Sequence, residues 1–271
     1  MTQSVLEALA AAQAAGLDRP DSHALLQALL QRPRSWLIAH DDAELNAEQT
    51  TQFATWIKRR AAGEPVAYLL GQKEFYGLAL EVTPATLVPR PDTETLVDWA
   101  LERLPAQASL LDMGTGSGAI ALAVKHRRPD ANVCATDASP AALAVAQRNG
   151  ERLGLSLEWL LGSWWEPLVG RCFDLIVSNP PYIAEGDSHL PALRHEPLSA
   201  LTAGPDGLDD LRTLISGAAP HLHPGGWLLL EHGYDQADAV AALFAAQPAF
   251  AKAEHRLDLG GHRRCTGAQV R

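Results

Sequence analysis

Residues 109–118 read Ser-Leu-Leu-Asp-Met-Gly-Thr-Gly-Ser-Gly, and this stretch decides the fold. Its apolar first half predicts a buried strand, and its alternating glycines predict a sharp turn into a helix. The same alternation recurs downstream, with strands expected at 132–136, 157–161, 173–178, 226–231, 251–257 and 264–270 and helices at 120–124, 140–152, 208–219 and 235–246. Strands that alternate with helices predict an α/β fold with a doubly wound parallel sheet.

The chain before this stretch has a different character. In the first 70 residues apolar side chains recur at three- and four-residue steps, which predicts a small helical bundle. Residues 74–82 contain an alternating stretch that predicts a short hairpin, and Asp92 or Thr93 is expected to cap the helix that follows. We therefore expect a helical domain at 1–72, a hairpin linker at 73–90 and the α/β domain at 91–271.

Composition limits the classes of function. The formal net charge is -10, which disfavours sequence-independent binding to DNA or RNA and suits either a basic protein partner or plain solubility. Cys134, Cys172 and Cys265 lie far apart without metal-ligand spacing, so we interpret them as buried, reduced residues and expect no metal site. The sequence shows no leader-like start and no apolar run that could span a bilayer, so we expect a soluble cytoplasmic protein without membrane association.

The glycine turn predicts a nucleoside ligand that carries a positive charge. Its Gly-x-Gly-x-Gly spacing at Gly114, Gly116 and Gly118 differs from the dinucleotide and Walker patterns. Asp112, two places before the first glycine, would repel a pyrophosphate but suits an ammonium or a sulfonium, as in S-adenosylmethionine. Asp137 ends the next strand, where a carboxylate can accept hydrogen bonds from both ribose hydroxyls. The alternative is a tight turn and a helix cap only.

Two tryptophans follow the third expected strand of the sheet. An adenine ring would lie at that strand end, and an indole from Trp164 or Trp165 can pack against it. Either side chain can equally be a core residue, so the residues alone do not choose between them.

Asn179-Pro180-Pro181-Tyr182 directly follows the apolar fourth strand. The prolines fix an extended, rigid turn, so that the Asn179 side-chain oxygen and the Pro180 carbonyl form two fixed acceptors. They can hold both hydrogens of a planar NH2 group and aim its nitrogen at a methyl donor, while Tyr182 stacks on the plane of an amide or base. The pattern therefore predicts methylation of an amide or aromatic amine nitrogen.

These motifs resemble those of the bacterial peptide chain release factor glutamine (N5) methyltransferases, over essentially the whole chain. Beyond the glycine turn and Asn179 to Tyr182, the resemblance rests on Gly63-Glu64-Pro65, Glu74-Phe75-Tyr76-Gly77, Pro89-Arg90-Pro91-Asp92-Thr93-Glu94, Gly204-Pro205-Asp206-Gly207-Leu208, Glu231-His232-Gly233 and Asp258-Leu259-Gly260-Gly261-His262-Arg263. It implies a class I, Rossmann-like methyltransferase fold and methylation of the glutamine in the Gly-Gly-Gln motif of class 1 release factors, which serves translation termination.

The resemblance also assigns roles to residues of this sequence. It implies that S-adenosyl-L-methionine, whose product is S-adenosyl-L-homocysteine, contacts Gly114, Thr115, Gly116, Ser117, Gly118, Asp137, Trp165 and Asn179. Of the two tryptophans, Trp165 is favoured. Asn179, Pro180, Pro181 and Tyr182 would hold the glutamine.

Other readings stay open at this point. Enzymes that methylate exocyclic amino groups of DNA or RNA carry similar tetrapeptides, but this sequence has no basic stripe for a nucleic acid. A sibling family methylates a glutamine of a ribosomal protein, and a non-catalytic binding module is a third possibility. We expect a monomer whose helical domain and residues 183–205 dock the protein substrate.

Overall fold

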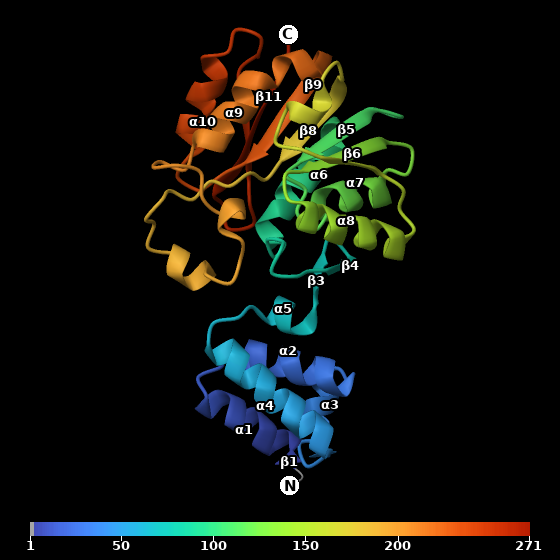
Figure 1. Ribbon diagram of the computed structural model, residues 1–271, viewed down its shortest axis with the longest axis vertical. Coiled ribbons are helices and arrows are strands. Elements are labelled where there is room, and N and C mark those ends of the chain that lie inside the picture. The colour runs from blue at the N-terminus through green and yellow to red at the C-terminus, as the bar shows by residue number, and fades with distance from the viewer. Residues whose placement is uncertain (1–2) are drawn as a thin grey trace. The chain divides into compact units, whose positions relative to one another are not determined.

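Seven strands form one sheet in the computed structural model, which describes residues 3–271 (Figure 1). In sheet order they are β10 (Glu254–Leu257), β11 (Arg263–Gln269), β9 (Leu222–Glu231), β8 (Phe173–Ser178), β5 (Ser109–Met113), β6 (Asn132–Asp137) and β7 (Glu158–Leu161). The five from β9 to β7 run parallel, whereas β11 is antiparallel to both of its neighbours, β9 and β10. The α/β prediction is confirmed, with this antiparallel edge added.

Alternate side chains of the central strands are buried in two separate hydrophobic cores. Leu110 and Leu175 pack with α6 (Glu94–Arg103) and α7 (Ala119–Arg127), whereas Leu111 and Ile176 pack with α9 (Asp209–Gly217) and α10 (Ala237–Ala245). A helix α8 (Pro140–Leu153) lies on the α7 side (Figure 1). Strands covered on both faces need continuous apolar runs, which explains why residues 109–113 and 173–178 are almost entirely buried.

A hairpin precedes this sheet in the chain. Strands β3 (Gln72–Phe75) and β4 (Leu78–Glu81) join through Tyr76 and Gly77, which have φ angles of 51° and 81°. Two successive positive φ angles favour the twist of a two-residue hairpin turn, and glycine adopts the second without steric cost. Phe75, Leu78 and Leu80 pack into the same core as α6, so the expected linker hairpin contributes to the core of the α/β unit.

The chain divides into two units, one ending at Gln72 and one running from Lys73 to Arg271. The first contains α1 (Val5–Ala14), α2 (Arg19–Leu30), α3 (Arg34–Ala39), α4 (Ala47–Ala61) and α5 (Val66–Leu70), with a two-residue pairing of β1 (Gln3–Ser4) and β2 (Glu44–Leu45) that the sequence did not predict. Capping boxes begin α1 and α4. Val5, Leu25, Leu26, Leu37 and Phe53 form its own core.

Some helices and strands begin or end at residues other than those expected from the sequence. The strand expected at 226–231 begins at Leu222, because exposed residues around Pro224 and Gly225 gave no apolar signal. Short 3-10 turns not expected from sequence are η1 (Pro91–Thr93), η2 (Glu166–Leu168), η3 (Leu190–Leu193), η4 (Leu198–Ala200) and η5 (Ala219–His221). Over residues 3–271 no helix combines the length and apolar character needed to cross a bilayer.

The interpretation of the cysteines is wrong for one of the three. Cys134 and Cys265 are buried free thiols as expected, but Cys172 is exposed. It directly precedes Phe173, the buried first residue of β8, and the number and spacing of the cysteines did not reveal this exposure.

Candidate active site

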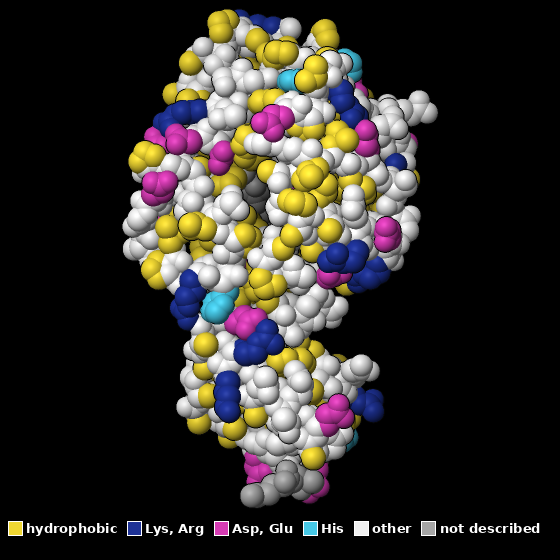
Figure 2. Space-filling view, in the orientation of Figure 1, with side chains coloured by type: hydrophobic (Ala, Val, Ile, Leu, Met, Phe, Trp, Pro, Cys, Tyr) yellow, Lys and Arg dark blue, Asp and Glu magenta, His cyan; other side chains and the backbone are white. Residues whose placement is uncertain are grey.

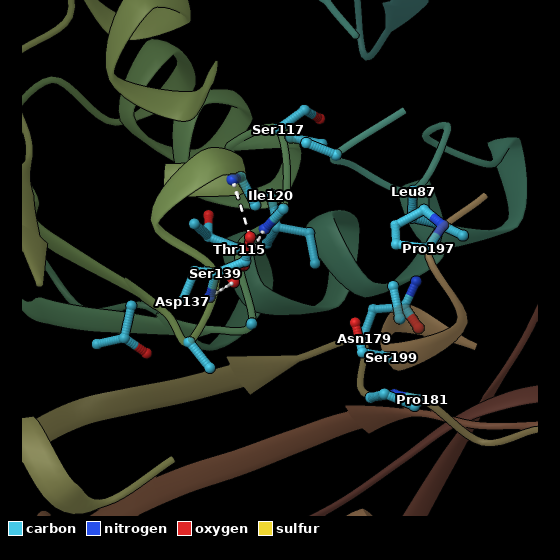
Figure 3. Close-up of a pocket in the computed structure, with 18 of the residues that line it drawn as sticks. Leu87, Thr115, Ser117, Ile120, Asp137, Ser139, Asn179, Pro181, Pro197 and Ser199 are labelled. Carbon is cyan, nitrogen blue, oxygen red and sulfur yellow. Dashed lines mark hydrogen bonds between the residues drawn. The ribbon is translucent and has the colours of Figure 1, made fainter. Parts of the chain in front are cut away.

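A cavity of about 520 Å³ opens at the carboxyl ends of β5, β6, β7 and β8 (Figure 3). The chain proceeds from β5 to β6 and β7 on one side and then returns to β8 on the other side of β5. Ligands of doubly wound sheets bind at this reversal of strand order. The cavity is lined by residues from six segments: 85–93, 114–120, 136–142, 162–164, 179–181 and 197–200, together with Asp210.

The glycine turn forms one wall of the cavity. Gly114, Gly116 and Gly118 have φ angles of 70°, 58° and 84°, a region that glycine enters without steric cost. The backbone N–H groups of Gly114 and Thr115 both donate to the Thr136 carbonyl at 2.9 Å, which ties the turn to β6. A Cβ on Gly118 would stand 2.9 Å from Leu122 Cδ1, so this position accepts no larger residue without displacement.

Asp137 stands where β6 ends, beside the glycine turn. Its Oδ2 accepts from the Gly116 N–H and its Oδ1 from the Ser139 N–H, both at 2.8 Å. Burial raises the pKa of this carboxyl, while the backbone hydrogen bonds lower it. The carboxylate therefore fixes the turn relative to α8 and still borders the cavity.

Asp112 lies beneath the turn, away from the cavity wall. Its Oδ2 accepts from the Thr115 hydroxyl at 2.6 Å and from the Ala121 N–H at 3.1 Å. Its Oδ1 is buried and has no hydrogen-bond partner among residues 3–271. Burial raises the pKa of Asp112 to about 7, and the charge of Asp137 adds to this rise. The sequence suggested direct contact with a cationic ligand, whereas the structure gives Asp112 the role of holding the turn.

The structure places the two tryptophans differently with respect to the cavity. Trp164 lines the cavity, and its ring lies 3.5 Å from where a Cβ on Gly114 would be. Trp165, favoured by the resemblance, lies elsewhere: it stacks on His221 with ring centroids 4.8 Å apart and donates to the Thr213 carbonyl. Trp164 has a φ of 43°, and its indole donates to Asp210 at 3.0 Å. A left-handed backbone angle at a non-glycine residue is uncommon, and nothing in the sequence around Trp164 predicts it.

The segment Asn179 to Tyr182 is divided between the wall and the interior. Asn179 and Pro181 line the cavity, whereas Pro180 is buried. The Asn179 Nδ2 donates to the Thr93 hydroxyl at 3.2 Å, which turns its Oδ1 the opposite way. Tyr182 packs behind the wall, where its hydroxyl donates to Glu231 at 3.3 Å. Burial, followed by the charge of Glu231, raises the pKa of Tyr182.

Thr93, one of the two residues expected to cap the helix α6, does not cap it with its side chain. It occupies the position before α6, but its side chain makes no capping hydrogen bond. Its φ and ψ are helical because the 3-10 turn η1 runs directly into α6, so the hydroxyl is free to meet Asn179 instead.

The sequence missed the second rim of the cavity. Ala85, Leu87 and Arg90 line it from the segment after the hairpin, and Ser199 lines it from the loop after β8. The buried carboxylate of Glu196 joins these two segments, because it accepts from the Val88 N–H at 3.0 Å and pairs with the Arg90 guanidinium. The partners of Glu196 lie more than 100 residues away in the sequence. No short sequence pattern therefore indicated that Glu196 joins the two segments or that these segments form one rim of the cavity.

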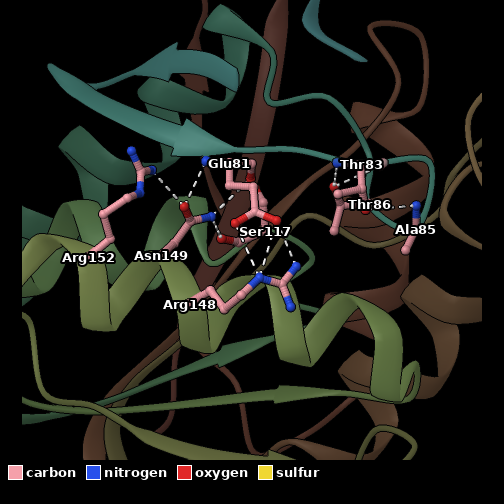
Figure 4. A network of polar contacts seen from close by, with 8 residues as sticks. All are labelled: Glu81, Thr83, Ala85, Thr86, Ser117, Arg148, Asn149 and Arg152. Atoms are coloured by element: carbon pink, nitrogen blue, oxygen red, sulfur yellow. Dashed lines mark hydrogen bonds and ion pairs between the residues drawn. The ribbon is translucent and has the colours of Figure 1, made fainter. Parts of the chain in front are cut away.

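Asn149, on α8, connects the hairpin to the glycine turn (Figure 4). Its Nδ2 donates to the carbonyls of Glu81 and Ser117 at 3.0 and 2.9 Å, and its Oδ1 accepts from the Glu81 N–H at 2.7 Å. The residue is fully buried, so these hydrogen bonds replace the water it has lost. Arg148 and Glu81 add an ion pair nearer the surface.

The molecular surface around the cavity mixes charges of both signs. On the face seen in Figure 2, Lys and Arg side chains are interspersed with Asp and Glu, and hydrophobic side chains surround the hollow in the α/β unit. This face presents no continuous basic stripe of the kind that tracks a phosphate backbone.

Comparison with known proteins gives this geometry a family context. Residues 3–71 match the family described as PrmC N-terminal domain, and residues 92–196 match the family described as Methyltransferase small domain. A release factor glutamine methyltransferase of Xylella fastidiosa (strain Temecula1) is 52% identical over 241 residues, covering 87% of this chain and 88% of the relative. One from Escherichia coli (strain K12) is 45% identical over 242 residues, covering 88% and 87%.

A solved structure supports the fold. A methyltransferase from Pyrococcus furiosus superposes with a TM-score of 0.57 at 20% identity, covering 80% of this chain and 98% of that protein. The sheet is therefore that of the class I, Rossmann-like methyltransferases, as expected.

Proposed function

The chain belongs to the release factor glutamine methyltransferases, and from this we propose that it methylates the side-chain amide nitrogen of the glutamine in the Gly-Gly-Gln motif of a class 1 peptide chain release factor. The methyl donor we propose is S-adenosyl-L-methionine. The observation that carries the proposal is the amide of Asn179, which borders the cavity with its Nδ2 held by Thr93 and its Oδ1 therefore directed away from that residue.

The residues around the cavity fit this donor. S-adenosyl-L-methionine, when bound, supplies an electrophilic methyl group on a sulfonium. The cavity volume of about 520 Å³ suits a ligand of nucleoside size. Gly114 to Gly118 allow close approach of a ligand to backbone, Asp137 offers acceptors for ribose hydroxyls, and Trp164 offers an indole face for adenine. Asp112 supports the turn from below.

The acceptor half of the site compensates for the low nucleophilicity of an amide nitrogen. An amide nitrogen is a poor nucleophile because its lone pair is delocalised. The Asn179 Oδ1 and the Pro180 carbonyl accept the two N–H groups of the glutamine, which favours a pyramidal nitrogen and directs its lone pair. In-line placement accounts for about 7–11 kcal/mol of barrier lowering. Pro181 borders the acceptor, and Tyr182 supports the turn from behind.

Methyl transfer from radiolabelled S-adenosyl-L-methionine tests this function. Three acceptors are offered in parallel: a purified release factor, its Gln→Ala variant in the Gly-Gly-Gln motif, and duplex DNA. Label on the intact release factor alone supports the proposal. Label on DNA, or equal label on the Gln→Ala variant, contradicts it. A purified ribosomal protein with a known methylated glutamine serves as a fourth acceptor, which tests for methylation of a ribosomal-protein glutamine instead.

Trp164 is expected to matter for donor binding and Trp165 is not. Trp164→Ala removes the indole from the cavity wall and should weaken S-adenosyl-L-methionine binding about fivefold, because an aromatic contact contributes on the order of 1 kcal/mol. Trp165→Ala is the matched control and should change that affinity less than about twofold. Isothermal titration calorimetry measures the affinity of both variants for S-adenosyl-L-methionine. A larger loss of affinity in Trp165→Ala than in Trp164→Ala would assign the adenine contact to Trp165.

We further propose that the first unit and residues 183–205 dock the release factor. The first unit has its own core and exposes Leu6 and Ile38, and the loop after β8 reaches the cavity rim at Ser199. Removal of residues 1–70 should raise KM for an intact release factor about tenfold or more while KM for the donor stays unchanged. Steady-state kinetics on a truncated protein whose circular dichroism shows a folded α/β unit test this, and an unchanged KM for the release factor rejects it.

A further inference from the structure

The two prolines of the acceptor turn limit the ways in which this turn can be held in place. Pro180 and Pro181 have no N–H group, so the middle of the turn is held only through carbonyl oxygens and through the side chains on either side. At one end the Asn179 amide meets Thr93. At the other end the Tyr182 carbonyl accepts a hydrogen bond from the side chain of residue 236, which the reaction as described does not use.

Gln236 uses both ends of its side-chain amide. Its Oε1 accepts from the Gly233 N–H at 2.8 Å, and its Nε2 donates to the Tyr182 carbonyl at 3.0 Å. The Gly207 carbonyl lies 3.4 Å from the same Nε2. A donor on one side and acceptors on the other allow only one orientation of the amide. The side chain therefore joins three segments of the chain in a defined way.

The backbone of Gln236 is itself fixed. The residue directly precedes α10, and its carbonyl accepts from the Val240 N–H at 2.9 Å. Val240 and Phe244 of that helix are fully buried in the core of the α/β unit. The Gln236 amide thus extends from a helix end that the core holds in place, as a side chain must if it is to position another group.

Gly207 packs directly against the same carbonyl. It has a φ of 72°, and a Cβ on it would stand 2.3 Å from the Tyr182 oxygen. A side chain at this position would therefore displace the carbonyl or the segment around residue 207. Residues 204–208 and 231–233 do not line the cavity, but through Gly207, Gly233 and the Gln236 amide both segments meet the end of the acceptor turn.

We propose that Gln236 is a positioning residue, which holds the Tyr182 carbonyl and thereby keeps the Asn179 and Pro180 oxygens directed at the methyl acceptor. This rests on the proposed function, because those two oxygens are the acceptors that the reaction needs. The prolines make the turn stiff, so a displacement at Tyr182 is transmitted to Pro180. A displacement of about 1 Å at the reacting groups is enough to slow transfer strongly.

Gln236→Glu tests the role with a side chain of almost the same size. One carboxylate oxygen still accepts from the Gly233 N–H, whereas the other faces the Tyr182 carbonyl, and two acceptors repel each other. Gly207→Ala displaces the same carbonyl by a different route, through its added Cβ. Gln147→Glu, on the exposed face of α8, introduces the same charge elsewhere and is the matched control.

The assay is methylation of a release factor at saturating concentrations of both substrates, with donor affinity measured by calorimetry and the melting temperature recorded. At about pH 8, Gln236→Glu and Gly207→Ala should each lower kcat about 10- to 100-fold, the cost of a small misplacement at the reacting groups. Donor affinity should stay within about twofold, because the glycine turn and Asp137 lie on other segments. Gln147→Glu should match the wild type within about twofold in both measurements.

The pH dependence of Gln236→Glu shows whether this hydrogen bond is what matters. A carboxylate that faces a carbonyl oxygen is disfavoured, so the pKa of the introduced carboxyl should be raised. Once protonated, the group can donate to the Tyr182 carbonyl as the amide does. The ratio of wild-type to variant kcat should therefore fall at least about threefold from about pH 8 to about pH 6.

Two titratable neighbours of this site keep their charge over that range of pH. His232 precedes Gly233, and burial lowers the pKa of its ring to about 4, so it stays neutral. Asp206 precedes Gly207, and its hydrogen bond with Arg212 lowers the pKa of its carboxyl, so it stays ionised. A change in the ratio therefore reports the introduced carboxyl.

Three results would overturn the proposal. Unchanged kcat in Gln236→Glu and Gly207→Ala would show that the Tyr182 carbonyl need not be held. A loss of donor affinity as large as the loss of kcat, or a loss of folded protein in both variants, would assign Gln236 a general structural role. A ratio that does not change with pH would exclude the hydrogen bond as the cause.

The wild-type arm separates the two hypotheses. Wild-type protein that leaves the release factor unlabelled refutes the proposed function and, with it, the positioning role. An active wild type with unaffected variants refutes the positioning role of Gln236 alone.

Discussion

Asn179→Ala is expected to lower kcat for release factor methylation by about 10²–10³-fold, the usual cost of removing one fixed hydrogen-bonding group that acts in the transition state. The side chain contributes the Oδ1 that directs the substrate NH2, and its truncation leaves the glycine turn, Asp137 and Trp164 untouched. Affinity for S-adenosyl-L-methionine should therefore change little. Single-turnover rates and calorimetric titration of the donor measure the two effects separately.

Asn179→Asp provides the control for this prediction. It keeps an oxygen acceptor at the position of Oδ1 and replaces the Nδ2 that donates to Thr93 with a second oxygen. Its activity should fall between those of the wild type and Asn179→Ala if the acceptor is what matters. An equal loss of donor affinity and of kcat in Asn179→Ala would instead assign the residue to the donor pocket and remove it from the acceptor half of the site.

Asn149→Ala is expected to lower the free energy of unfolding by about 2–4 kcal/mol. The substitution leaves the Glu81 N–H and the carbonyls of Glu81 and Ser117 without their buried partner (Figure 4). Because Ser117 belongs to the glycine turn, donor affinity should fall as well. Urea unfolding followed by circular dichroism measures the first effect, and calorimetry measures the second.

Arg148→Ala is the matched comparison, one residue away on the same helix. Arg148 pairs with Glu81 at 2.7 Å, but the two side chains are 49% and 33% exposed. An exposed pair of this kind contributes about 0–1 kcal/mol, since water competes for both charges. A larger loss of stability in Arg148→Ala than in Asn149→Ala would show that the ion pair, and not the buried amide, connects the hairpin to α8.

The features of the fold and the site that the sequence predicted well depend on residues that are adjacent in the chain. Short contiguous sequence patterns predicted the order of strands and helices, the glycine turn and Asn179. The parallel sheet then brings Gly114, Asp137 and Asn179 to one edge. These residues lie at the ends of strands, which is where a doubly wound sheet binds its ligands.

What the sequence missed depends on contacts between distant residues. Glu231 meets Tyr182 across 49 residues, and Thr93 meets Asn179 across 86. No periodicity or spacing encodes such pairs. The sequence also did not indicate that Trp164, and not Trp165, lines the cavity, because the two indoles are adjacent and follow the same strand end.

The strand order also has a consequence for how the chain comes to be folded. The central strand β5 lies between β6, which follows it closely, and β8, whose residue Leu175 pairs with Leu110 although it lies 65 positions later in the chain. During synthesis the stretch through β7 therefore emerges with an apolar strand edge still unpaired. Such edges recruit other chains, and non-local parallel pairing is slow. Between the synthesis of β7 and the arrival of β8 the nascent chain therefore carries an exposed strand edge that favours aggregation.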